Sequence, residues 1–229
     1  MTKADTKVRT ARTTILGFVT LIAVLLLGTV LYVSTDIGAS EITAGKDYRV
    51  VDNARPRRAG DPIEVLEFFS YACIHCKNFD PAADEWAAEQ PDDVSFRRVP
   101  ATFSPVWALL SQSYLTFESA GVLEQNHTRM FRAIHDAGRE FRDPQAVADY
   151  VDGRGISAED FMREFDSPAV REAMRDADRA QRAYLISSTP QLVVAGKYVV
   201  GMEGGQRRAL QVLNHLIAQE RAGESTPAN

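Results

Sequence analysis

The chain has 229 residues, of which 45% are hydrophobic, and a formal net charge of −5 at neutral pH. Nucleic-acid-binding proteins present basic patches, so this acidic balance argues against a nucleic-acid partner. Only two cysteines are present, which excludes a small fold held together by several disulfides.

The N-terminal region contains a charge-free apolar run of 19 residues, 15–33. As an α-helix this run spans about 28 Å, close to the roughly 30 Å hydrocarbon core of a bilayer. Four basic residues and one acidic residue precede it, a bias that makes residues 1–34 a cytoplasmic N-terminus and a transmembrane anchor. A cleaved signal peptide is the alternative, since Gly38-Ala39-Ser40 supplies small residues where a peptidase could cut. In either case the rest of the chain lies outside the cytoplasm.

The remainder is large enough for one domain with a sizeable core, or one domain that carries an insertion. It holds 22 basic and 30 acidic residues, a formal charge of −8. We divide it into a polar linker at 35–46, the first part of an α/β domain at 47–103, a helical insertion at 104–186, the second part of the α/β domain at 187–220 and a flexible tail at 221–229.

The first part of the α/β domain alternates strand and helix. Short apolar runs at 48–51 and 63–69, bordered by turn-forming residues, predict two strands. A helix is predicted from the two cysteines to about Glu89, and 94–99 predicts a third strand. The result is a βαβ unit whose helix begins at the cysteines.

A block of helices follows. Helices are predicted at 105–121, 122–136, 144–153 and 168–184, with a short one between the last two that begins after Ser157. Three of them begin with a capping residue before a proline: Ser104-Pro105, Asp143-Pro144 and Ser167-Pro168. Ser157 and Asp160 form a capping box before a fourth. Apolar residues recur at helical spacing, among them Met130, Phe131 and Ile134, and are expected to form the core of the insertion.

Strands return after this block. Residues 191–194 and 197–200 predict a hairpin joined by Ala195-Gly196, and a last amphipathic helix runs from Gln206 to about Glu220. The order of elements predicts an α/β fold in which an inserted α-helical domain divides the sheet in sequence.

The two cysteines, Cys73 and Cys76, allow three interpretations. A structural zinc site needs four ligands, and besides His75 the three other histidines sit in predicted helices without paired ligand spacing, so no metal site is expected. A purely structural disulfide across so short a loop would stabilise the fold little. A redox-active pair meets neither objection.

The position of the pair favours redox chemistry. A thiolate at a helix N-terminus is stabilised by unpaired backbone N–H groups and by the helix dipole. Cys73 is expected to occupy that position, exposed and able to attack, with Cys76 one turn further on and shielded. His75 lies between them and can add a positive charge near the Cys73 sulfur.

A second element lies far along the chain, where Thr189-Pro190 precedes the hairpin. A proline at the start of a strand is compatible with either a trans or a cis peptide bond. Together with VLEFFSYACIHC, the helical insertion and the hairpin LVVAGKYVV, this pair makes the segment from about Asp47 to Glu220 resemble the DsbA-type proteins. These are thioredoxin-fold dithiol oxidases of the bacterial periplasm.

The resemblance assigns roles to residues of this chain. It implies that Cys73 is the nucleophile, that Cys76 resolves the mixed disulfide and that His75 is the histidine of the CxHC motif. It also implies a cis peptide bond at Pro190, facing the cysteines, and a Thr189 backbone that hydrogen-bonds a substrate chain.

One further role concerns a charge beneath the active site. The buried glutamate of the family corresponds to Glu67, which is expected to have a raised pKa and to shuttle the proton of Cys76. Its usual lysine neighbour corresponds to Arg98, which keeps the charge but cannot give up a proton.

The chain departs from the best-known members in several places. Its dipeptide is Ile74-His75 rather than Pro-His, and the threonine before Pro190 is common in reductive relatives. Lys77 and Pro81 follow the thioredoxin pattern CxxCKxxxP. An uncleaved N-terminal anchor is also unusual for a family whose familiar members are soluble.

The resemblance implies a protein-disulfide oxidoreductase. We expect a monomer whose Cys73-Cys76 disulfide, without any other cofactor, introduces disulfides into reduced exported proteins and is reoxidised by a DsbB-like quinone reductase. The anchor at 15–33 would place it in the bacterial inner membrane, single-pass, with its catalytic domain in the periplasm. The alternatives are a thioredoxin-like reductase or isomerase and, from a different class, a non-catalytic peptide-binding or chaperone module.

Overall fold

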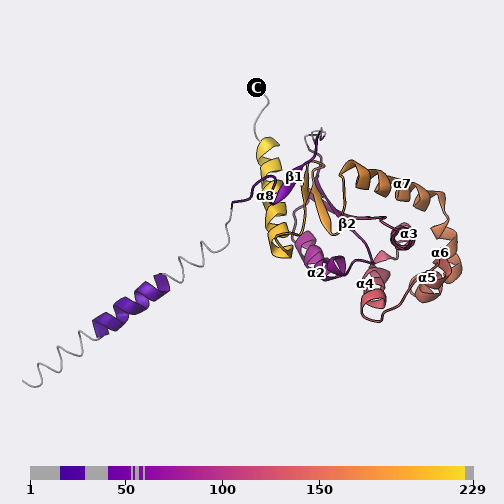
Figure 1. Ribbon diagram of the computed structural model, residues 1–229, viewed down its shortest axis with the longest axis horizontal. Coiled ribbons are helices and arrows are strands. Elements are labelled where there is room, and N and C mark those ends of the chain that lie inside the picture. Colours follow the sequence, from indigo (N-terminus) through magenta and orange to yellow (C-terminus); the bar gives the residue numbers. More distant parts are fainter. Residues whose placement is uncertain (1–15, 29–40, 53, 55–56, 59, 225–229) are drawn as a thin grey trace, which may run out of the picture. The chain divides into compact units, whose positions relative to one another are not determined.

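The computed structural model describes residues 16–28, 41–52, 54, 57–58 and 60–224, and the chain divides into two units, 1–42 and 43–229. Residues 16–28 are helical (Figure 1). In the part of the chain that the structure describes, none of the helices has the length and hydropathy that crossing a bilayer requires. The predicted anchor at 15–33 begins and ends outside the described residues.

A five-stranded sheet forms the centre of the second unit (Figure 1). Its strands are β1 (Tyr48–Val50), β2 (Ile63–Phe69), β3 (Val94–Pro100), β4 (Gln191–Val194) and β5 (Tyr198–Val200). The order across the sheet is β1-β5-β4-β2-β3, with β2 and β3 parallel and the other neighbours antiparallel. The hairpin turn is the predicted one, because Ala195 and Gly196 both have positive φ, 51° and 66°.

Strand β2 is almost completely buried and leads directly to the cysteines. All of its residues except Glu64 are buried, as expected for a strand covered on both faces. Successive side chains point to opposite faces. Leu66 and Phe68 pack with Ala177 of the helical insertion, whereas Phe69 belongs to the cluster that contains Cys73.

Helices cover the sheet and form the insertion. They are α2 (Ile74–Ala88), α3 (Pro105–Ser119), α4 (Leu123–His135), α5 (Pro144–Val151), α6 (Ala158–Phe165), α7 (Pro168–Ala183) and α8 (Gln206–Glu224). The predicted caps are present: the side chains of Ser104, Asp143, Ser157 and Ser167 each accept a hydrogen bond from the backbone N–H three residues on. Helices α3 to α7 follow β3 and precede β4, so the predicted insertion into an α/β sheet is confirmed.

The C-terminal end corrects one expectation. Helix α8 continues to Glu224, so residues 221–224 are helical and the predicted flexible tail starts too early. In this last turn Arg221 forms a bidentate ion pair, with Nε 2.6 Å and Nη2 2.7 Å from the two carboxylate oxygens of Asp93. This pair ties the last turn to the loop before β3.

Candidate active site

The two cysteines lie at the start of α2, directly after the buried β2. Cys73 is the N-cap residue, and its sulfur accepts a hydrogen bond from the backbone N–H of Cys76 at 3.3 Å. The same sulfur lies 3.4 Å from the carbonyl oxygen of Thr189. Both cysteines are free thiols in the structure, so it shows the dithiol form of the pair.

The structure corrects the expectation that Cys73 is exposed. Only 8% of Cys73 is accessible, and Cys76 is completely buried. Cys73 packs within the cluster that contains Phe69 and Tyr71, and the Thr189 segment lies against its sulfur. A substrate therefore reaches a largely enclosed sulfur.

The surroundings separate the acidities of the two thiols. The pKa of Cys73 falls from 9.0 to about 5, chiefly because the Cys76 thiol hydrogen-bonds its sulfur, with further lowering from the Thr189 side chain and the backbone N–H groups of Cys76 and His75. Burial raises the pKa of Cys76 far above its usual range, and the neighbouring Cys73 adds to this. At neutral pH the dithiol form is therefore a Cys73 thiolate beside a Cys76 thiol.

The Thr189-Pro190 peptide bond is cis, as the sequence resemblance implied. The hydroxyl oxygen of Thr189 is buried, and its side chain is, after the Cys76 thiol, the one that lowers the pKa of Cys73. Beside this segment lies a groove of about 350 Å³, called the substrate groove below after the role proposed for it. It is lined by His75, Phe79, Ser188, Thr189, Pro190, Met202, Glu203, Gly205 and Gln206.

His75 is exposed and lines this groove. Its effect on the Cys73 pKa comes through its backbone N–H group. The additional charge that the His75 side chain was expected to supply stays a prediction.

A buried charged cluster lies beneath the cysteines. Glu67 is 1% exposed, and Arg98 Nε donates to its carboxylate at 3.0 Å. Arg98 Nη2 also contacts Asp80 at 2.9 Å and Asp84 at 2.7 Å. Burial raises the pKa of Glu67 to about 7 although the Arg98 charge opposes it. The predicted burial, raised pKa and arginine neighbour of Glu67 are thus confirmed.

Comparison with known proteins agrees with this geometry. Residues 64–211 match the model of the DSBA-like thioredoxin domain. The chain belongs to the DsbA-like thioredoxin family. It is 38% identical to the thiol:disulfide interchange protein DsbA of Azotobacter vinelandii over 82% of this chain and 89% of that protein. The corresponding protein of Pseudomonas aeruginosa is 37% identical over 80% of this chain and 88% of its own length.

The solved structures support the same assignment. The crystal structure of Pseudomonas aeruginosa DsbA superposes with a TM-score of 0.77 at 35% identity, covering 82% of this chain and 99% of that one. The fold is therefore DsbA-like, and it contains the free thiols at a helix N-terminus, the cis proline and the helical insertion. The chain is a protein-disulfide oxidoreductase of the kind that introduces disulfides.

The raised pKa of Glu67 makes the stability of this DsbA-like protein depend on pH. A carboxyl group whose pKa is higher in the folded state contributes fully to stability below the unfolded value of 4.5, and that contribution is lost as the pH rises through about 7. Replacing Glu67 by glutamine removes this loss. Between pH 4.5 and 7.5 the wild type should lose roughly 3 kcal/mol of unfolding free energy relative to Glu67→Gln. Urea denaturation of both proteins across this range measures it, and parallel pH profiles would contradict it.

Residues that the sequence analysis did not single out also surround the site. Asp80 follows Cys76 by one turn of α2, and its carboxylate lies 2.8 Å from Nε2 of His127. His127 and His135 of α4 both contact Tyr71, two residues before Cys73. A signal was available: His127, Phe131 and His135 are spaced four residues apart, which places them on one side of a helix.

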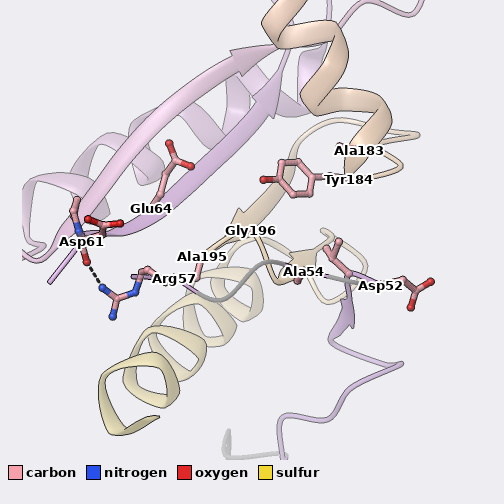
Figure 2. A pocket seen from close by; sticks show the side chains of 11 residues that line it. Asp52, Ala54, Arg57, Asp61, Glu64, Ala183, Tyr184, Ala195 and Gly196 are labelled. Carbon is pink, nitrogen blue, oxygen red and sulfur yellow. Dashed lines mark hydrogen bonds between the residues drawn. The ribbon is translucent and has the colours of Figure 1, made fainter. Parts of the chain in front are cut away.

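A second pocket, of about 490 Å³, lies elsewhere (Figure 2). It is lined by Glu64 at the start of β2, by Tyr184 after α7 and by Arg57, which donates to the carbonyl oxygen of Asp61. Because β2 has seven residues, its two ends are separated by roughly 20 Å. This pocket therefore lies away from the cysteines.

Proposed function

We propose that the Cys73-Cys76 disulfide oxidises substrate thiols, with Cys73 as the sulfur that is attacked. A substrate thiolate forms a bond to Cys73 Sγ while the Cys73–Cys76 bond breaks, and Cys76 takes the electron pair. A second substrate thiolate then attacks the substrate sulfur of this mixed disulfide and releases Cys73 as a thiolate. The substrate has lost two electrons, and the pair has become the dithiol without any other cofactor.

The observation that supports this direction is the low pKa of Cys73. Donors around its sulfur stabilise the thiolate, which is the group that leaves in the second step. A stabilised thiolate makes the reduced enzyme more stable and its disulfide a stronger oxidant. A charged His75 would act in the same direction.

The proton of Cys76 needs a route, since this thiol has a strongly raised pKa and is fully buried. Glu67 is the proposed carrier. With a pKa of about 7, it is present in both the protonated and the ionised form near neutral pH. Arg98, paired with Glu67, holds the carboxyl group in place without exchanging a proton itself.

The substrate chain is proposed to lie along the substrate groove. Thr189 and Pro190 border the groove and lie against Cys73, so the Thr189 backbone can hydrogen-bond an extended peptide while its cysteine reaches Sγ. Any exported protein with reduced cysteines in an extended segment fits this arrangement. The enzyme acts as a monomer.

The cellular setting follows from the N-terminal segment and from the relatives. The proposal places the catalytic domain in the periplasm, with a DsbB-like quinone reductase as the electron acceptor. Residues 15–33 would anchor the enzyme in the inner membrane, which raises its effective concentration near that partner. Alkaline carbonate extraction of bacterial membranes separates the anchored from the released form, and a fully soluble protein would rule out the anchor.

The decisive experiment is the reduction potential of the Cys73-Cys76 pair in glutathione buffers. We expect a value well above the glutathione poise, because thiolate stabilisation favours the reduced form. The threonine before Pro190 and the Lys77/Pro81 pattern favour the alternative, a reductase or isomerase. A potential near roughly −270 mV, the value of thioredoxin, would establish that alternative.

A further inference from the structure

Helix α4 of the insertion presents three side chains to a single residue, Tyr71. Its hydroxyl lies 2.9 Å from Nδ1 of His127, and its ring meets the ring of Phe131 edge to face at 5.1 Å between centroids. Its backbone carbonyl oxygen lies 2.8 Å from Nε2 of His135. His127, Phe131 and His135 follow one another at four-residue spacing, so one side of α4 holds Tyr71 at both of its polar groups and at its ring.

Tyr71 lies where these three contacts can affect the chemistry of Cys73. It is 1% exposed and lies in the short segment between β2 and α2, two residues before Cys73. In that segment the Cys73 N–H donates to the carbonyl oxygen of Ser70 at 3.0 Å. The conformation of this segment therefore sets how the Cys73 sulfur meets the N-terminal amides of α2.

The hydrogen bonds have defined directions. A carbonyl oxygen only accepts, so His135 Nε2 donates to Tyr71. In the neutral imidazole of His127, Nε2 donates to the Asp80 carboxylate at 2.8 Å, which leaves Nδ1 to accept the hydroxyl proton of Tyr71. Burial raises the pKa of Tyr71 well above its usual value, so the hydroxyl keeps this proton.

The C-terminal end of α4 also contacts α2, just after the cysteines in sequence. Asp136, directly after α4, forms an ion pair with Lys77, the residue that follows Cys76. Contacts from α4 and its C-terminal end thus lie on both sides of the Cys73-Cys76 segment. The insertion is in this way connected to the nucleophile itself.

We infer that His127 and His135 are positioning residues that, through Tyr71, hold the Cys73 sulfur against the N-terminal amides of α2. The inference rests on the proposed role of Cys73 as the attacked sulfur. The two histidines need not touch substrate or sulfur, because they act on the backbone and side chain of Tyr71. Through these contacts the helical insertion influences the reduction potential of the Cys73-Cys76 pair.

Two single substitutions test this arrangement, one for each hydrogen bond between α4 and Tyr71. Tyr71→Phe removes the hydroxyl that His127 accepts while keeping the ring in place, and His135→Leu removes the donor to the Tyr71 carbonyl. In each variant the loosened segment should raise the Cys73 pKa and lower the equilibrium constant for oxidation of glutathione about three- to tenfold. Thiolate absorbance at 240 nm and glutathione equilibration of the full-length enzyme measure the two quantities.

Two controls make the result specific. His135→Gln retains an N–H donor and should restore both quantities towards wild type, which a general packing defect would not do. His215→Gln, at a half-buried histidine of α8, should leave both unchanged. Thermal unfolding shows that each variant is folded, and Tyr71→Phe, which keeps its ring, still tests the inference if His135→Leu fails to fold.

The outcomes separate this inference from the proposed function. If the wild type oxidises glutathione with a low Cys73 pKa and both Tyr71→Phe and His135→Leu match it, the positioning role is wrong and the function stands. If the wild type itself has an unshifted Cys73 pKa and a reducing potential, the proposed function fails first. A rise in the Cys73 pKa in both variants with rescue by His135→Gln establishes the inference.

Discussion

Replacing Cys73 by serine should abolish the oxidation of reduced proteins, with the rate falling by at least about a thousandfold, because a serine oxygen cannot take part in thiol–disulfide exchange. The measurement is the loss of free thiols from a reduced model protein incubated with the enzyme. Cys76→Ser is the matched control, since it keeps the sulfur that is attacked. It should also lose turnover. Offered a substrate that already contains a disulfide, its Cys73 thiolate should attack one sulfur and release the other as a thiolate, and the mixed disulfide should accumulate because no Cys76 thiol is present to resolve it; mass spectrometry measures this adduct.

These two variants distinguish the candidate functions. Equal adduct formation through either cysteine would remove the special role given to Cys73, whose thiolate lies at the N-terminus of α2. Full activity of Cys73→Ser in assisting the folding of exported proteins would instead establish a non-catalytic peptide-binding module. That result would leave the substrate groove as the functional site and the cysteines as a structural feature.

The local features of this fold were predictable because local chemistry decides them. Ser104, Asp143, Ser157 and Ser167 cap the helices that they were expected to begin. Each cap is a hydrogen bond between residues three apart, so it leaves a pattern in the sequence. Strand β2 has the predicted bounds, because its seven-residue apolar run is flanked by turn-forming residues.

The expectations that failed depend on distant contacts. Cys73 is enclosed because Thr189, 116 residues further along, lies against its sulfur, and no local pattern records that contact. The last turn of α8 forms an ion pair with Asp93, 128 residues before Arg221. The helical spacing of α4 predicted a core-facing side, but it could not show that two of the inward side chains hydrogen-bond Tyr71.

The buried charged residues below the cysteines were predictable only in part. The resemblance to the family assigned Glu67 and Arg98 as a pair, and the register of β2 against β3 places them directly opposite one another. The sequence analysis did not foresee that Asp80 and Asp84 of α2 share the same arginine. A single guanidinium group therefore serves three carboxylates, two of which are buried.

Because three carboxylates contact Arg98, replacing this residue should cause the largest change in stability. In Arg98→Met the side chain, which is 12% exposed in the wild type, is replaced by an uncharged one of similar length, and Glu67 and Asp80 lose their cation. Removing one partner of a buried ion pair costs about 3–5 kcal/mol, because the remaining charge is left desolvated. We expect a loss of that size in the free energy of unfolding at pH 7, measured by urea denaturation of the reduced enzyme.

The neighbouring arginine supplies the matched control. Arg97 is 55% exposed and lies 3.4 Å from Glu64, so Arg97→Met should change the free energy of unfolding by less than about 1 kcal/mol. Adding Glu67→Gln to Arg98→Met should recover part of the loss, since it removes one of the unpaired carboxylates, and Asp80 keeps its hydrogen bond from His127. A loss below about 1 kcal/mol in Arg98→Met would mean that solvation or protonation of the carboxylates compensates for the lost cation. Arg98 would then not be needed to stabilise the ionised form of Glu67.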